Sequence, residues 1–168
     1  MKNNGFSLIE LIVVIGILSI LLAIATMNGR EWMERYRVEG QTKELYADLM
    51  SARVSAMQRN RVFFAKLAAN QYAIYEDTYN AVTPSSPEGD DILQTANDRP
   101  AMQTILRYAL NATFDVSTTN VNFSTNGLAF PNATIWFTST ANPLSDCVVL
   151  STTRILMGKM NGTDCVAQ

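Results

Sequence analysis

The sequence contains no histidine and only two cysteines among its 168 residues. Without histidine there is no Ser-His or Cys-His catalytic pair, and neither a glycine-rich phosphate loop nor an evident pair of catalytic acids is present. The two cysteines lack Cys-x-x-Cys spacing, which argues against a zinc site. We therefore expect a protein that is not an enzyme and that holds neither a metal ion nor a cofactor.

Positive charge is also scarce. The chain has 13 Lys and Arg residues against 15 Asp and Glu residues, which gives a net charge of -2. Binding to a phosphate backbone depends on clustered basic side chains, and this composition does not supply them in bulk. Nucleic acid is therefore a minor candidate as a partner.

One long uncharged apolar run lies close to the start of the chain, from Leu11 to Gly29. At about 1.5 Å per residue, its roughly 19 residues span most of a hydrocarbon layer about 30 Å thick. Glu10 directly precedes the run, and an acid within lipid costs roughly 2.5 to 3.5 kcal/mol at the centre of a helix. We expect residues 6–29 to form a transmembrane helix in which Glu10 needs a partner. The flanking charges do not settle the orientation of this helix, because both signs follow it and Lys2 alone precedes it.

The polar stretch that follows, residues 30–60, keeps a helical pattern. It contains no proline, and its apolar side chains recur at steps of three or four residues after Val38: Leu45, Leu49, Ala52 and Ala56. This period predicts an amphipathic helix with one face to bury. Joined to the apolar run, it forms one continuous helix of roughly 50 residues, about 75 Å long.

After the helix, short runs typical of β-strands predict a β-rich globular domain over residues 61–168. Residues 62–67 and 71–76 predict a hairpin. Residues 78–100, rich in Pro, Ser, Asp and Asn, predict a long surface loop with a short helical turn at 92–96. Further strands are expected over residues 105–110, 121–123, 128–130, 134–137, 147–150 and 154–157. The predicted fold class is α+β, with the second half of a long helix packed on an antiparallel β-sheet.

Both cysteines, Cys147 and Cys165, lie late in the chain and outside the apolar run. In an oxidising periplasm this pattern indicates a disulfide, whose loop closure has an effect on the order of 3 kcal/mol. Two unpaired buried thiols are the alternative.

The segment Gly-Phe-Ser-Leu-Ile-Glu, from Gly5 to Glu10, resembles the cleavage and assembly signature of type IV prepilins. The resemblance implies that residues 1–5 are a leader, which a prepilin peptidase removes after Gly5. Phe6 then becomes the mature N-terminus and is methylated on its amine. The resemblance also implies the pilin fold. Met27 stands where many pilins have proline, so we expect a straighter stem.

The same resemblance gives Glu10 a role as a docking group. In type IV pilins and pseudopilins, the positive N-terminus of one subunit meets an acid of its neighbour, which offsets the desolvation of both charges. The implied partners are other pilins or pseudopilins, the prepilin peptidase, the inner-membrane assembly platform and membrane lipid. The implied location is the bacterial inner membrane, crossed once with the C-terminal domain in the periplasm, and then a pseudopilus or pilus.

A second segment narrows the resemblance. Ala-Arg-x-x-Ala at residues 52–56, followed by Arg59 and Asn60, resembles the end of the helix in H-type minor pseudopilins and FimT-like minor pilins. FimT-like DNA-uptake pilins often carry a Gly-Arg-x-Arg cluster in their last hairpin, which this chain lacks. Arg154 and Lys159 lie there instead, and two charges make them weak DNA-contact candidates.

The leading hypothesis is a minor pseudopilin that is cleaved, methylated and assembled into a periplasmic pseudopilus for type II protein secretion. A minor type IV pilin serving pilus assembly, adhesion or DNA uptake is the first alternative. A membrane-anchored periplasmic binding domain that does not polymerise is the second.

Two further features are interpreted as solvent-exposed surface without a specific function. The acidic segment at residues 87–91 lacks the Asp-x-Asp-x-Asp-Gly spacing of a calcium loop, so we interpret it as a solvated loop. Arg53 is interpreted as a solvated arginine on the helix surface, with a docking role as the alternative.

Overall fold

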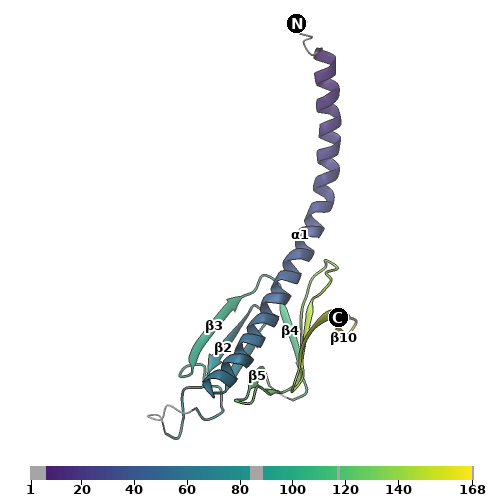
Figure 1. The fold of residues 1–168 in the computed structure, drawn as a ribbon. Coiled ribbons are helices and arrows are strands. Elements are labelled where there is room, and N and C mark those ends of the chain that lie inside the picture. Colours follow the sequence, from purple (N-terminus) through teal and green to yellow (C-terminus); the bar gives the residue numbers. More distant parts are fainter. Residues whose placement is uncertain (1–6, 84–88, 117, 168) are drawn as a thin grey trace.

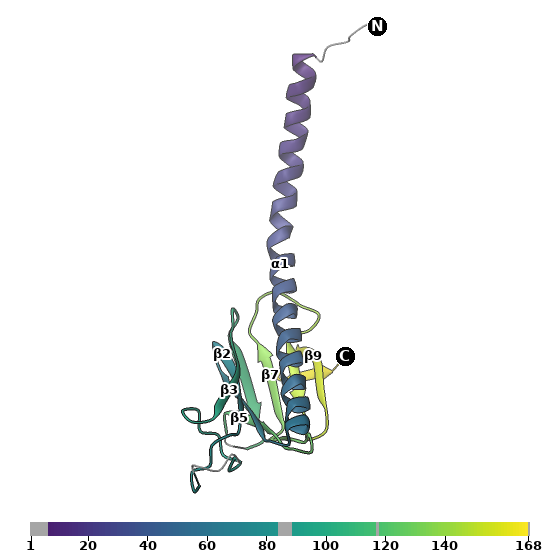
Figure 2. The ribbon, with the colours of Figure 1, turned by 60° about the vertical axis from the view of Figure 1, so that its left-hand side comes forward.

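The structure of the chain is a computed structural model. It describes residues 7–83, 89–116 and 118–167, with the backbone alone at residues 24–28 and 30. One helix, α1 (Leu8–Arg59), occupies the first third of the chain with 52 residues, which is about 78 Å at the standard rise. Figures 1 and 2 show its first half projecting alone and its second half lying against the strands. The single continuous helix expected from the sequence is confirmed.

The two ends of α1 have different caps. Ser7 precedes the helix in an extended conformation, with φ -73° and ψ 142°. Asn60 ends it in the left-handed region at φ 51°, and its backbone N–H donates to the carbonyl of Ala56. Asparagine tolerates this conformation better than most residues. The helix is unbroken at Met27, although Figure 1 shows its axis changing direction as it reaches the strands.

Ten strands among the described residues form two five-stranded sheets, and all of their pairings are antiparallel. Across the first sheet the order is β3 (Arg99–Ile105), β2 (Gln71–Glu76), β1 (Phe63–Ala68), β5 (Asn120–Phe123) and β6 (Ala129–Phe130). Across the second sheet the order is β10 (Asp164–Ala167), β9 (Ile155–Asn161), β8 (Cys147–Leu150), β7 (Ala133–Phe137) and β4 (Leu110–Phe114). The antiparallel sheet expected from the sequence is thus present as two sheets.

The second half of α1 packs on both sheets, touching β1 and β5 of the first sheet and β7, β8 and β9 of the second. A backbone hydrogen bond links the first sheet to the turn between β8 and β9, where the N–H of Ala129 in β6 donates to the carbonyl of Thr152 at 2.9 Å. Strands β1 and β2 form the expected hairpin, with Ala68 opposite Gln71 at its tip. The helix therefore closes a two-sheet domain, with the core between the helix and the strands.

The prediction of a strand over residues 105–110 is wrong. The chain leaves the first sheet at Ile105 and enters the second at Leu110, so residues 106–109 form a crossover between the sheets. The N–H groups of Leu106 and Leu110 donate to the carbonyls of Asn70 and Ala69 in the β1–β2 turn. These bonds satisfy the backbone without extending either strand.

Three strands were not expected in their observed places: β3, β4 and β10. Strand β3 begins inside the segment expected to be a loop and contains Pro100. Because β3 is an edge strand, proline does not interrupt a ladder on both sides. The turn expected at residues 92–96 is found slightly later, where the N–H groups of Asn97 and Asp98 donate to the carbonyl of Gln94.

The buried face of α1 agrees with the predicted period. Its apolar members are all at most 3% exposed: Val38, Leu45, Leu49, Ala52 and Ala56. Thr42 occupies the missing step of this face, fully buried, with its hydroxyl donating to the Val38 carbonyl at 2.9 Å. Burying each larger apolar side chain contributes roughly 1.5 to 3 kcal/mol. The face therefore fixes the helix on the sheets.

Candidate assembly site

The first part of α1 presents an uncovered apolar surface. From Leu8 to Leu22, its large apolar side chains are between 48% and 76% exposed. A helix that is apolar on every side needs neighbours, either other helices or lipid. In the part of the chain that the structure describes, no helix combines the length and apolar character needed to cross a membrane. The span expected over residues 6–29 stays a prediction.

Glu10 is the only charged residue from Leu8 to Leu22. It lies in the first turn of α1 with an exposed side chain, and no described residue forms a hydrogen bond or salt bridge with its carboxylate. A carboxylate near a helix N-terminus gains about 0.3 to 1 kcal/mol from the exposed N–H groups. An ionised carboxylate only accepts hydrogen bonds, so this group can receive a cation from another molecule.

The other polar side chain of this surface is satisfied internally. The hydroxyl of Ser19 donates to the carbonyl of Ile15 at 2.7 Å, one turn earlier in α1. Between Leu8 and Leu22, Glu10 is therefore the polar side chain that has no partner among the described residues.

Two aromatic residues lie where α1 approaches the globular part. Trp32 and Tyr36 are 63% and 67% exposed, and their ring centroids are 5.6 Å apart. Beside them, Arg35 and Glu31 form an ion pair at 2.5 Å. Exposed ion pairs of this kind contribute little stability. Both aromatic rings are therefore accessible to another molecule.

The two residues at the expected cleavage point, Gly5 and Phe6, lie outside the described residues. Their roles as the last leader residue and the methylated N-terminus stay predictions.

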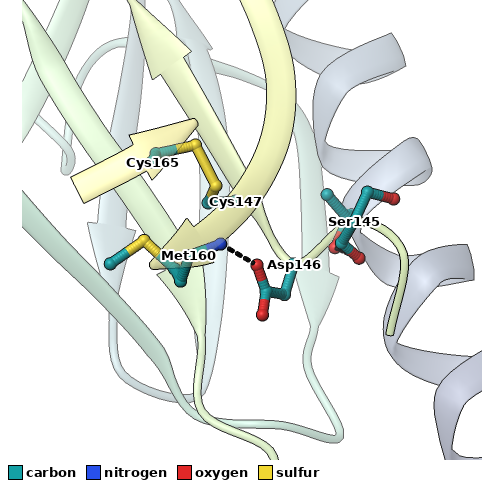
Figure 3. The surroundings of a disulfide bond; sticks show 6 residues. Ser145, Asp146, Cys147, Met160 and Cys165 are labelled. Atoms are coloured by element: carbon teal, nitrogen blue, oxygen red, sulfur yellow. Dashed lines mark hydrogen bonds between the residues drawn. A yellow bond between two sulfur atoms is a disulfide. The ribbon is translucent and has the colours of Figure 1, made fainter. Parts of the chain in front are cut away.

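The expected disulfide is present, which excludes the alternative of two unpaired thiols. Cys147 in β8 is bonded to Cys165 in β10, with Cα atoms 6.0 Å apart (Figure 3). Strand β9 runs between them, and its Gly158 pairs with Cys147 on one side. A Cβ atom on Gly158 would lie 2.3 Å from the carbonyl oxygen of Val166, so β10 approaches too closely for any side chain there.

A side-chain contact supports the same corner of the second sheet. The carboxylate of Asp146, next to Cys147, accepts a hydrogen bond from the N–H of Met160 at 2.7 Å (Figure 3). The disulfide and this contact together hold β9 and β10 against β8.

The arginine and lysine candidates have mainly internal contacts. Arg53 donates to the carbonyl of Thr153 at 2.9 Å and so ties α1 to the turn before β9. Lys159 donates to the side chain of Asn142 at 2.5 Å. Arg154 is exposed, and none of the described residues pairs with its side chain. The role of Arg154 and Lys159 as weak DNA contacts stays a prediction.

The end of α1 meets a buried acid that sequence patterns did not single out. Glu76, at the end of β2, is 4% exposed. Its carboxylate lies 2.7 Å from the guanidinium of Arg59 and 3.7 Å from those of Arg61 and Arg99. Three guanidinium groups around one carboxylate satisfy the buried charge.

The next residue, Asp77, is also buried, at 2% exposure. One carboxylate oxygen, Oδ2, accepts the N–H of Asp91 at 2.8 Å. Burial raises the pKa of Asp77 to about 6, and the charges of Asp98 and Asp90 act in the same direction, while the Asp91 hydrogen bond opposes them. Ionisation of the Asp77 carboxyl group is therefore less favourable than in an exposed aspartate.

The loop after Asp77 is organised by two further aspartates. Asp98, 3% exposed, accepts the N–H groups of Thr78, Tyr79 and Gln94. Asp90 accepts the N–H of Ala81 at 3.0 Å, and hydrogen bonds of this kind lower its pKa. Within the described residues, no group of three or more acids, histidines or cysteines is placed to hold a metal ion. Residues 87 and 88 of the acidic segment lie outside the described part.

Two sequence families match the chain. Residues 1–26 match the prokaryotic N-terminal methylation motif. Residues 41–153 match the type II transport protein GspH family, which is more than half of the chain. No curated protein matches the chain significantly.

Solved structures of similar fold include the minor pseudopilin EpsH from the type 2 secretion system of Vibrio cholerae. It is 12% identical, with 73% of this chain and 97% of that chain covered and a TM-score of 0.50. The type IV minor pilin FimU of Pseudomonas aeruginosa is 16% identical, with 80% and 96% covered and a TM-score of 0.51. At these identities the likeness concerns the fold. This similarity of fold agrees with the match to the family model. The chain therefore belongs to the type II transport protein GspH family and is type IV pilin-like.

Proposed function

We propose that the chain is a minor pseudopilin of type II protein secretion. In this proposal a prepilin peptidase removes residues 1–5 and methylates Phe6. The mature chain is anchored in the inner membrane with its globular domain in the periplasm. The assembly platform then adds it to a pseudopilus. The methylation motif over residues 1–26 and the GspH match support this route.

The observation that carries the proposal is the uncovered stem with one unpaired acid. Large apolar side chains from Leu8 to Leu22 stay exposed, and Glu10 has no partner among the described residues. Packing stems side by side covers the apolar surface. The methylated amine of a neighbouring Phe6 then supplies the cation that Glu10 lacks.

The test replaces Glu10 by leucine or glutamine in the full chain and measures the fraction recovered in filaments with its partner subunits. Both variants remove the negative charge, so we expect recovery to fall about tenfold or more, as loss of roughly 1.4 kcal/mol or more requires. Glu34→Leu, which changes an exposed acid beyond the stem, is the matched control and should assemble normally. Normal recovery of Glu10→Leu and Glu10→Gln would show that the docking role is wrong.

Mass spectrometry of the membrane-extracted chain separates the proposal from a simple anchored domain. The expected N-terminus is methylated Phe6, with residues 1–5 missing. An intact N-terminus in cells that process other prepilins would favour an anchored periplasmic binding domain that does not polymerise.

A minor type IV pilin is the second candidate, favoured by the shared fold with FimU. The two roles differ in which system fails without the chain. Deletion of the gene should abolish secretion of type II substrates and leave surface pili intact. Loss of pili with normal secretion would favour the second candidate.

A further inference from the structure

The chain contains four Asn-Gly pairs, and this dipeptide has a chemistry of its own. The backbone nitrogen of the glycine can attack the side-chain carbonyl carbon of the asparagine, because glycine has no Cβ atom to hinder the approach. The reaction needs an unbound asparagine side chain and a glycine N–H that no other group holds. The structure therefore decides which pair reacts. The pairs are Asn4-Gly5, Asn28-Gly29, Asn126-Gly127 and Asn161-Gly162.

The first two pairs are set apart by their position in the chain. Residues 4 and 5 lie outside the described residues and do not enter the comparison. Asn28 and Gly29 lie in the interior of α1. The N–H of a residue inside an α-helix donates to the carbonyl four residues earlier. The helix therefore holds the nitrogen of Gly29.

The turn that contains the third pair, Asn126-Gly127, is fixed by hydrogen bonds. The N–H of Gly127 donates to the carbonyl of Ser124 at 2.8 Å, and the N–H of Leu128 donates to the Ser124 hydroxyl at 3.2 Å. Gly127 is also buried, and a Cβ atom there would lie 2.6 Å from the sulfur of Met57. The nitrogen of Gly127 is therefore bound to an acceptor in a closed environment.

The fourth pair lies open at the tip of the β9–β10 hairpin. Asn161 ends β9, and Gly162 and Thr163 form the turn to Asp164, the first residue of β10. All four residues are exposed. No described residue accepts the N–H of Gly162 or bonds to the side chain of Asn161. A Cβ atom at residue 162 would have nothing within 4 Å. The nitrogen and the side-chain amide are thus both unbound in one exposed turn.

We propose that Asn161 is a site of spontaneous covalent modification, converted to aspartate and isoaspartate with water as the co-reactant. The nitrogen of Gly162 bonds to Cγ of Asn161 and gives up its proton, and the Cγ–Nδ2 bond breaks, so that ammonia leaves with that proton. Water then opens the cyclic imide. Breaking the new bond at Cγ gives aspartate, and breaking the original peptide bond gives isoaspartate. This chemistry does not depend on a role in a filament.

The product changes the hairpin in two ways. Residue 161 gains a negative charge directly opposite Asp164 in the β9–β10 ladder, and like charges at opposed positions destabilise a strand pair. Isoaspartate also adds an atom to the backbone beside a turn whose geometry depends on its length. Strand β10 stays attached through the bond from Cys165 to Cys147. The modification therefore loosens the tip of the hairpin without releasing the strand.

The test incubates the purified full chain in detergent micelles at mildly alkaline pH and follows each pair by peptide mass spectrometry, with fragmentation that distinguishes isoaspartate from aspartate. In the folded chain, Asn161 should convert at least about tenfold faster than Asn28 and Asn126, which corresponds to a barrier lower by about 1.4 kcal/mol. After reduction and unfolding in guanidinium chloride, the three asparagines should convert at similar rates, because the structure no longer holds any of the nitrogens.

Two variants check the attacking group. Gly162→Ala places a side chain beside the nitrogen and should slow the conversion of Asn161 about tenfold or more. Thr163→Ala keeps the pair intact and is the matched control, which should convert like the wild type. The main comparison uses the unmodified chain, so it holds even if Gly162→Ala distorts the turn at φ 65°.

Three results would overturn the proposal: no conversion of Asn161, conversion of Asn126 at an equal or higher rate in the folded chain, or conversion of Asn161 to aspartate without isoaspartate, which would exclude the cyclic imide. None of these results would change the expected dependence of assembly on Glu10.

Discussion

Buried polar side chains differ sharply in how well they are satisfied. Among the described residues, four of them are buried in the globular part: Thr42, Glu76, Asp77 and Asp98. Thr42 bonds within the helix, Glu76 has three guanidinium neighbours, and Asp98 accepts three backbone N–H groups. The Oε1 atom of the half-buried Gln94 also lacks a partner, but of these four fully buried residues only Asp77 has a side-chain oxygen without one. It is therefore the side chain most sensitive to its surroundings.

Stability should depend on pH through Asp77. Its pKa rises from the ordinary value of 3.8 to about 6 in the folded chain, so the folded state binds more protons than the unfolded state between these values. The free energy of unfolding should therefore decrease as pH rises from about 4 to about 6, by on the order of 1 to 3 kcal/mol. Asp77→Asn should remove this decrease, as measured by denaturant unfolding of the full chain at several pH values.

The matched control for this prediction is Asp164→Asn, which changes an exposed aspartate and should keep the wild-type pH dependence. Identical pH profiles for Asp77→Asn and the wild type would contradict the assignment to Asp77.

Tyr72 anchors β2 to the helix through its hydroxyl. The residue is 1% exposed, and its hydroxyl donates to Oδ2 of Asp48 at 2.5 Å. Burial raises the pKa of Tyr72, followed by the bond to Asp48, so the phenol stays a donor at neutral pH. Tyr72→Phe should lower the free energy of unfolding by about 1.5 to 3 kcal/mol, the range for bonds to charged groups.

Urea unfolding checks this value. Tyr75→Phe in the same strand is the control, because none of the described residues bonds to its hydroxyl, and it should change stability by at most about 0.5 kcal/mol. Equal losses for the two variants would show that the Asp48 bond contributes nothing.

Sequence patterns identified some of the important side chains and missed others. The two cysteines could be paired because no other cysteine competes, and Glu10 stood out because the surrounding run is uncharged. Asp77 carries no such mark, since an acid after a strand is ordinary loop chemistry. Its burial depends on residue 89 returning to it from the far side of a loop, and no local pattern encodes that approach.

Secondary-structure elements were predictable where one period dominates. The steps from Val38 to Ala56 identify the buried face of α1 because tertiary packing and helical period agree. Residues 105–110 misled because β-rich composition does not reveal that a chain is crossing between sheets. Strand β10 was missed for the opposite reason. Three of its four residues are exposed, so no alternating buried pattern marks the strand, and a disulfide holds it in place.

Removing the disulfide should therefore release β10 before any other strand of the second sheet. Among the described strands, β10 pairs only with β9, and the Cys147–Cys165 bond links it covalently to β8. In the double variant Cys147→Ala/Cys165→Ala, the amides of β10 should exchange faster and the free energy of unfolding should fall by about 3 kcal/mol. Hydrogen exchange by mass spectrometry measures the first and denaturant unfolding the second.

Strand β4, at the opposite edge of the same sheet, is the internal control and should keep its exchange rate. Unchanged exchange in β10 would mean that pairing with β9 suffices without the disulfide.

The described chain has one part whose apolar side chains are buried within the molecule and one part whose apolar side chains are exposed. The helix face from Val38 onward is buried on two sheets, whereas the apolar side chains from Leu8 to Leu22 remain exposed. One acid, Glu10, accompanies that exposed surface without a partner among the described residues. This exposed apolar surface needs a cover, either other helices or lipid.

High-resolution electron cryomicroscopy of filaments that contain the chain is the decisive measurement. The amine nitrogen of a neighbouring subunit's N-terminal residue should lie within about 4 Å of the Glu10 carboxylate, the distance of an ion pair. A Glu10 carboxylate that faces lipid or solvent in the assembled filament, with no cation within that distance, would contradict the account.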